Sequence, residues 1–180
     1  MAIKLERFKF EEIPQLISWS PSKEFLLQWA GPSYTLESME KQLRNDINLM
    51  LEDNPKSLMF SAKLSESNET VGHVQLLNID RTNMSARIGR VIVGEKENRG
   101  KGIGLQIIKS VLDIAFNKLK LHRVDLGVFD FNKSAIACYE KAGFIIEGNF
   151  RECRKMDGQY WSLLNMSILE DEYRKRQMGK

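Results

Sequence analysis

The sequence predicts an α+β fold in which one mixed, mostly antiparallel sheet carries helices on both faces. The first observation is the order of its patterns: a strand, then helices, then an antiparallel meander, then strand–helix units. The second is that 180 residues, 42% of them hydrophobic and 28% charged, suit one globular domain. The third is a glycine-rich turn at 99–104 between a strand pattern and a helix pattern. We therefore expect a single domain over residues 1–180.

The elements of residues 1–84 follow from apolar spacing and from the breakers between them. Apolar residues recur at helical spacing over 35–51, where Pro55 ends the pattern. Two apolar runs that follow are joined by a polar turn, which is typical of a hairpin. The expected elements are a strand at 3–8, helices at 11–19 and 35–51, a short turn or helix at 24–29, and strands at 57–64 and 70–79.

The second half alternates strands with helices. A long amphipathic helix is expected after the glycine turn, and Gly143 is a good residue to end the next helix. The expected elements are strands at 85–93, 123–129, 144–147 and 160–169 and helices at 105–119 and 133–142. Residues 174–180 are expected to be frayed.

The glycine turn predicts a phosphate-binding site. Glycines at 100, 102 and 104 allow a ligand close to the backbone, and the following helix directs free N–H groups and its positive dipole end to the same place. Arg99 and Lys101 add cationic side chains. The spacing excludes both a Walker loop and the dinucleotide fingerprint, since no Gly-Lys-Ser/Thr follows and no third glycine falls in register.

What remains, Arg-x-x-Gly-x-Gly, resembles the diphosphate loop of the GCN5-related N-acetyltransferases, the GNAT family. About thirty residues further on, Asn132 to Phe144 is similar to the family's second segment, Asn-x-x-Ala-x-x-x-Tyr-x-Lys-x-Gly-Phe. Residues 143–173 resemble the branch that acetylates the N-termini of ribosomal proteins. This chain has Asn98-Arg99 where many members of that branch carry an aromatic residue and Trp.

The resemblance implies that acetyl-CoA is the co-substrate and that no metal takes part. Residues 85–173 would form the cofactor half and residues 1–84 the acceptor side. Two central parallel strands, 88–93 and 124–129, would splay apart to admit the pantetheine arm. The cofactor-binding residues would be Val91, Val93, Arg99, Gly100, Lys101, Gly102, Ile103, Gly104 and Asn132. Of these, the amides at 101–104 would bind the diphosphate.

The implied reaction is direct acetyl transfer from acetyl-CoA to a primary amine. Tyr139 is the candidate general acid for the leaving thiolate, although it would also suit a core aromatic that packs its helix. Glu147 is the candidate base, on the strand after the second motif. His73, Glu95 or a water chain to a more distant carboxylate are alternatives.

The acceptor is an amine, either a small molecule or a peptide N-terminus, whose identity stays open. Trp19 and Trp29 are expected either to line the acceptor pocket or to cap the core. Acidic residues of the 35–53 region would attract a cationic amine or form a solvated helix face. These residues are Glu37, Glu40, Asp46, Glu52 and Asp53.

Composition narrows the classes of partner and of metal site that the protein can have. A net charge of +3 does not suggest nucleic acid or membrane as the main partner, so RNA contact is expected only through a ribosomal-protein substrate. The two cysteines fit a reducing cytoplasm. Together with the two histidines they form no cluster with the spacing of metal ligands. A homodimer through strand 160–169 is compatible with the resemblance. The rival function is a catalytically silent CoA-binding sensor.

Overall fold

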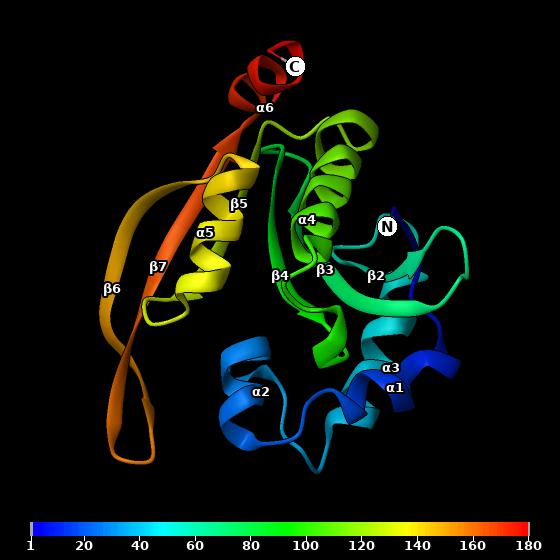
Figure 1. Cartoon of the computed structure of the whole chain (residues 1–180), viewed down its shortest axis with the longest axis vertical. Coiled ribbons are helices and arrows are strands. Elements are labelled where there is room, and N and C mark those ends of the chain that lie inside the picture. Colours follow the sequence, from blue (N-terminus) through cyan, green and yellow to red (C-terminus); the bar gives the residue numbers. More distant parts are fainter. Residues whose placement is uncertain (1, 180) are drawn as a thin grey trace.

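The computed structural model describes residues 2–179 and contains a seven-stranded sheet in the order β1-β2-β3-β4-β5-β7-β6 (Figure 1). Among the described strands only the β4–β5 pair is parallel, so the predicted mixed, mostly antiparallel sheet is confirmed. The strands are β1 (Ile3–Arg7), β2 (Leu58–Leu64), β3 (Thr70–Asp80), β4 (Ser85–Val93), β5 (Arg123–Phe129), β6 (Ile145–Met156) and β7 (Gln159–Leu169).

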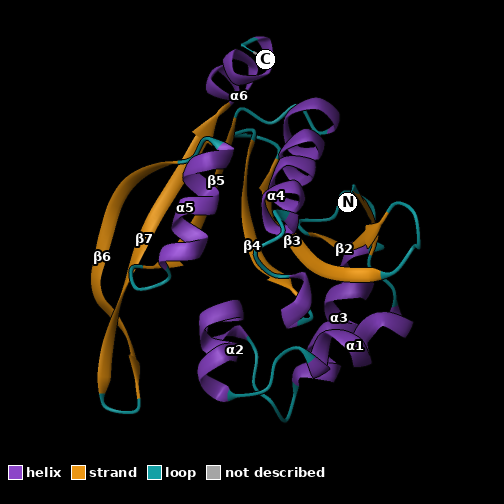
Figure 2. Ribbon diagram, in the orientation of Figure 1, coloured by secondary structure: helices purple, strands orange, loops and turns teal. Residues whose placement is uncertain are grey.

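Helices cover both faces of the central strands (Figure 2). Residues 58–62 of β2 are all buried, and because successive side chains point to opposite faces, both faces of that strand are covered. The helices are α1 (Ile13–Ser18), α2 (Lys23–Ala30), α3 (Met39–Met50), α4 (Ile103–Asp113), α5 (Lys133–Ala142) and α6 (Glu170–Met178). Across residues 2–179, none of these helices combines the length and apolar character that a membrane span requires.

The central strands β4 and β5 are paired only over their first halves. Pairing runs from Ser85–Arg123 to Ile88–Leu126 and stops there, although both strands continue. Further along β4, Arg90 has a φ of 53°, close to a register shift against β3. Figure 1 shows the two ribbons diverging, with α2 near their open end. The predicted splaying of these two strands is therefore present.

Helix α4 begins directly after a glycine that has a positive φ. Gly102 is the N-cap with a φ of 78°, and the apolar stripe that follows packs against β1, β3 and β4. The expected helix 105–119 is present as α4 and, directly after it, a π-helical segment, Ile114–Lys118. A π-helix has wider turns than an α-helix, and in this segment Ala115 and Phe116 stay buried at the end of the apolar stripe.

The expectation of a frayed end at 174–180 is wrong for residues 174–178, which belong to α6. The Glu172 carboxylate accepts the Leu169 N–H, which caps this helix, and Arg174 pairs with Glu170 one turn earlier. Tyr173 is buried and its ring stacks on Phe116 at 4.8 Å. The Tyr173 contact is with a distant element, so composition alone did not indicate it.

Two further boundaries differ from expectation. The third helix begins at Met39 rather than 35, because residues 36–38 form a turn in which Leu36 remains exposed. Strand β6 runs to Met156 instead of ending near 147. It is polar and exposed along most of its length, so alternation of apolar residues could not reveal it.

Candidate active site

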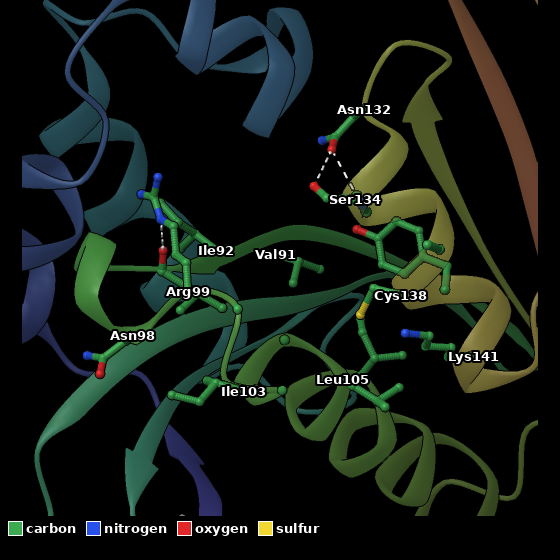
Figure 3. Close-up of a pocket in the computed structure, with 18 of the residues that line it drawn as sticks. Val91, Ile92, Asn98, Arg99, Ile103, Leu105, Asn132, Ser134, Cys138 and Lys141 are labelled. Carbon is green, nitrogen blue, oxygen red and sulfur yellow. Dashed lines mark hydrogen bonds between the residues drawn. The ribbon is translucent and has the colours of Figure 1, made fainter.

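A cavity of about 460 Å³ opens between the glycine turn, the end of β4 and helix α5 (Figure 3). Arg99 and Ile103 lie on one side of it, and Asn132 and Ser134, at the start of α5, lie on the other. Eight of the nine predicted cofactor-binding residues line this cavity, namely Val91, Val93, Arg99, Gly100, Gly102, Ile103, Gly104 and Asn132. The ninth, Lys101, is exposed and is not part of the lining.

The glycines of the turn serve two different purposes. Gly100 and Gly102 have φ values of 75° and 78°, with open space where a Cβ would be, so their backbone conformation requires glycine. Gly104 is helical, and a Cβ there would lie 3.7 Å from Val93 Cγ2 and 3.8 Å from Cys138 Sγ. Since both neighbours line the cavity, any longer side chain at 104 would enter it.

The amides at the start of α4 are available to a ligand. The Gln106 N–H donates to the Gly102 carbonyl at 3.1 Å and is the first to do so within this helix. The preceding amides, 102–105, therefore lack intrahelical acceptors. Together with the helix dipole, they form a site for an anion.

Arg99 holds the turn closed. Its Nε donates to the Val93 carbonyl at 3.2 Å and its Nη2 donates to the Gly94 carbonyl at 2.9 Å. Figure 3 shows this side chain folded back toward the end of β4. The guanidinium thus ties the end of the strand to the start of the turn.

A second cavity, of about 130 Å³, lies where β4 and β5 separate. Its walls include residues 88–91 of β4, residues 127–129 of β5, and Gln28 and Trp29 of α2. The two cavities adjoin each other, because they share five lining residues: Phe25, Val91, Asn132, Ala135 and Tyr139. Trp29 therefore lines a pocket, and lining a pocket was one of the two roles expected for this residue.

Tyr139 lines both cavities. Burial raises the pKa of its phenol well above the ordinary value, so the hydroxyl is protonated at neutral pH. Within residues 2–179, no protein group is hydrogen-bonded to that hydroxyl, and the ring contacts Phe144 edge-on at 6.1 Å between centroids. A protonated, unengaged hydroxyl beside the cavity is suited to donating a proton.

Asn132 has one of its two amide ends engaged. Its Oδ1 accepts from the Ala135 N–H at 3.2 Å and from the Ser134 hydroxyl at 3.1 Å, which caps α5. The Nδ2 atom carries two N–H donors, and the Asn132 side chain lines the cavity. Asn132 thus both begins the helix and offers a donor to a ligand.

Glu147 lies away from both cavities. Arg123 donates to its two carboxylate oxygens at 2.7 and 2.5 Å, and Asn165 donates to it at 3.1 Å. The hydrogen bond with Arg123 is the main cause that lowers the Glu147 pKa to about 2. A carboxylate of such low basicity, outside the lining residues, does not have the properties expected of the base.

The two alternative bases are also engaged elsewhere. The Glu95 carboxylate accepts the Trp19 indole N–H at 3.0 Å. His73 is buried, and burial lowers its pKa to about 3, so the ring is neutral at physiological pH. Gln75 accepts from Arg90 through Oε1, so its Nε2 must donate to His73 Nε2, and the histidine proton is on Nδ1.

Sequence reasoning missed several lining residues. Phe25 and Gln28 lie outside the motifs, and Cys138 occupies an unspecified position of the second one; they reach the cavities through the packing of α2 and α5. Arg90 did have a signal, because it is a charged residue inside the apolar run 88–93. In residues 2–179 there is no cluster of three or more metal-ligating side chains.

The model of the acetyltransferase (GNAT) family matches residues 23–144. A probable N-acetyltransferase of Bacillus subtilis, YjcK, is 30% identical over 83% of this chain and 81% of its own length. A putative ribosomal N-acetyltransferase of the same organism, YdaF, is 33% identical over 57% of this chain and 55% of its own length.

Among solved structures, a spermidine N-acetyltransferase from Vibrio cholerae in complex with CoA and spermine superposes with a TM-score of 0.82. The alignment covers 96% of this chain and 98% of that one at 24% identity. At this identity the likeness concerns the fold.

Proposed function

Because the chain belongs to the acetyltransferase (GNAT) family, we propose that its two cavities together transfer the acetyl group of acetyl-CoA to a primary amine. Acetyl-CoA is the donor, and the larger cavity is its site. The single observation that carries this proposal is the set of free amides at 102–105, which open onto that cavity. The cofactor half, residues 85–173, supplies all of the lining except Phe25.

The amides and the dipole of α4 bind the diphosphate. Arg99 does not reach the anion in this role but sets the shape of the turn through the carbonyls of Val93 and Gly94. Lys101, on the exposed side, adds long-range attraction only. The pantetheine extends along β4 past Val93 and Val91. On the side of β4 that faces β5, the described residues show no strand pairing beyond Ile88. Asn132 Nδ2 donates to it from the opposite wall.

Transfer is direct. The amine nitrogen attacks the thioester carbonyl carbon, a C–N bond forms, the C–S bond breaks, and the thiolate takes a proton to give CoA. Tyr139 provides that proton, and its raised pKa keeps the proton available until the thiolate develops. Cys138 is not a nucleophile in this scheme, because burial raises the pKa of its thiol.

The amine loses its proton to water. Within the described residues, no Asp, Glu or His side chain lines either cavity. The proposed route is therefore a water chain that leads to solvent, which differs from the earlier alternative of a water chain to a more distant carboxylate. The openings of the cavities provide the path to solvent.

A titration of free thiol tests the proposal. The protein is mixed with acetyl-CoA and a panel of amines, and release of CoA thiol is followed with time. Release that depends on the amine supports the transferase. Tight acetyl-CoA binding without release for any amine would select the silent sensor instead. Absence of acetyl-CoA binding would overturn both.

We further propose that the chain forms a homodimer through its last two strands. Strand β6 is an edge strand, and Ile145, Phe150 and Tyr160 of the β6–β7 hairpin each expose more than half of their surface, at 54%, 57% and 57%. Sedimentation equilibrium of the wild type and of Phe150→Asp tests this. A dimer that the substitution dissociates supports it, and a monomeric wild type contradicts it.

A further inference from the structure

Strand β4 contains a β-bulge close to the point where it leaves β5. In the register of β3 and β4, Arg90 and Val91 lie opposite the single residue Val74. Arg90 has a φ of 53°, a conformation that is unfavourable for residues with a Cβ and that glycine usually adopts in bulges of this kind. The pairing of β4 with β5 ends at Ile88, two residues earlier. Since a bulge bends its strand and increases the local twist, it directs β4 away from β5.

The bulge also changes the face of the sheet to which the Arg90 side chain points. A Cβ at Gly72 of β3 would lie 2.8 Å from a side chain of α4, so Leu76, four residues further on, faces that helix too. Ile88 is paired with Leu76 and shares its face. In a regular strand Arg90 would follow Ile88 onto this face and place its charge against the apolar stripe of α4. Instead its guanidinium reaches Gln75, whose side chain lies on the opposite face.

Three acceptors from separate parts of the chain hold the guanidinium on that opposite face. Arg90 Nη1 donates to Tyr34 Oη at 2.6 Å and to Asp46 Oδ2 at 2.9 Å. It also donates to Gln75 Oε1 at 2.6 Å, and the guanidinium carbon lies 4.0 Å from the centroid of the Tyr34 ring. Burial raises the pKa of the Tyr34 phenol, so its hydroxyl stays protonated and donates to Asp46 Oδ2 at 2.5 Å. Asp46, which was expected either to attract a cationic amine or to be solvated, is thus a partner of Arg90.

Arg90 therefore favours the bulged form of β4 over a flat strand. Its three acceptors are reached only from their own face, and a flat strand would bury the charge without a partner beside α4. A flat β4 would also be free to continue its ladder along residues 127–129 of β5, which among the described strands pair with β7 alone. Paired strands lie about 4.8 Å apart, which leaves no room between them for a pantetheine arm.

We infer that Tyr34, Asp46 and Gln75 are positioning residues that act through Arg90. They hold the bulge of β4 and so keep the gap between β4 and β5 open for the cofactor. None of the three lines either cavity, so their effect on acetyl-CoA is transmitted through β4. The inference rests on the proposed function in one respect, namely that the pantetheine lies in this gap.

Two substitutions at position 90 separate positioning from direct contact. Arg90→Gly removes the anchor but adopts a positive φ freely, whereas Arg90→Val removes the same charge and disfavours that φ. Isothermal titration with acetyl-CoA should therefore show an affinity for Arg90→Val that is roughly 5- to 30-fold lower than for Arg90→Gly. Equal affinities, or weaker binding by Arg90→Gly, would overturn the inference. Loss of a direct contact would affect both variants alike, and loss of packing would affect the glycine variant more.

Substitutions of Asp46 provide a test in which Arg90 itself is kept. Asp46→Asn retains an oxygen that accepts from Arg90 and Tyr34, whereas Asp46→Leu retains none. We expect Asp46→Leu to weaken acetyl-CoA binding by roughly 3- to 10-fold and Asp46→Asn to have a smaller effect. In an Arg90→Gly background, Asp46→Leu should have no further effect, because its partner is gone. No loss in Asp46→Leu, or the same loss in both backgrounds, would contradict a role that acts through Arg90.

Hydrogen exchange distinguishes a failure of this inference from a failure of the proposed function. The amides of residues 127–129 are followed by NMR without any ligand, and pairing with a flat β4 should slow at least one of them in Arg90→Val relative to Arg90→Gly. If the wild type does not bind acetyl-CoA, the proposed function fails and exchange alone decides. Slower exchange in Arg90→Val then supports the inference, and equal exchange contradicts it. Urea denaturation verifies that each variant is folded, and if Arg90→Val is not, the Asp46 variants decide by the same two measurements.

Discussion

The indole ring of Trp19 fills the space beside Gly94, so closely that a Cβ on Gly94 would lie 2.2 Å from Trp19 Cε2. The same indole donates its N–H to Glu95 at 3.0 Å. This contact joins the end of α1 to the residue that leads from β4 into the glycine turn. It therefore fixes the end of α1 against the start of the glycine turn.

Gly94→Ala should accordingly destabilise the protein by about 1–3 kcal/mol, because the added methyl group overlaps a buried ring. Urea denaturation measures the free energy of unfolding. In a Trp19→Ala background the same substitution should cost much less, since the ring is gone. Equal costs in both backgrounds would show that the contact is not the cause.

Gly104→Glu should abolish tight binding of acetyl-CoA without loss of stability. Its side chain would enter the cavity between Val93 and Cys138 and repel the diphosphate. A carboxylate in the first turn of a helix is favourable, and so is replacement of a helical glycine. Isothermal titration should show an affinity lower by about 10- to 100-fold or more.

Gly104→Ala is the matched control, because its Cβ makes only ordinary contacts. It should bind acetyl-CoA nearly as well as the wild type. Unchanged affinity in Gly104→Glu, in a protein that still unfolds cooperatively, would contradict the location of the diphosphate.

Tyr139→Phe should lower kcat and leave acetyl-CoA affinity nearly unchanged, since the ring packing is kept and only the hydroxyl is lost. General acid catalysis contributes about 10²- to 10⁴-fold, which sets the expected range. Stopped-flow thiol release and titration calorimetry measure the two quantities separately. A variant with wild-type turnover would leave Tyr139 as a packing residue.

Glu147→Gln should not change turnover, but it should change how stability depends on pH. The folded-state pKa of about 2 is lower than that of an ordinary carboxyl group, so the ion pair with Arg123 stabilises the wild type above pH 4.5. That stabilisation is lost as the pH falls toward 2. For an ion pair that is about one-third exposed, the expected size is about 0.2–1 kcal/mol.

Denaturant unfolding of wild type and Glu147→Gln at pH 6 and at pH 3 provides the measurement. The difference in unfolding free energy should be present at pH 6 and smaller at pH 3. Loss of turnover in Glu147→Gln at neutral pH, with unchanged acceptor binding, would restore Glu147 as the base.

The cofactor cavity was largely predictable because its contributors are close in sequence. The turn at 99–104 and the segment from Asn132 supply backbone groups and caps whose conformations depend on local residue types such as glycine and asparagine. The smaller cavity was not predictable, because it depends on where α2 packs and on a strand irregularity at Arg90. The position of Glu147 likewise follows from a long-range pairing with Arg123 that spacing cannot show.

All of the residue roles depend on one claim. The claim is that the amides at the start of α4 bind the diphosphate of coenzyme A. A crystal structure of the protein with acetyl-CoA tests it most directly. We expect the diphosphate oxygens within about 3 Å of the amide nitrogens of residues 102–105, with the pantetheine between β4 and β5. A cofactor bound elsewhere on the molecule, with that cavity filled only by water, would contradict the account.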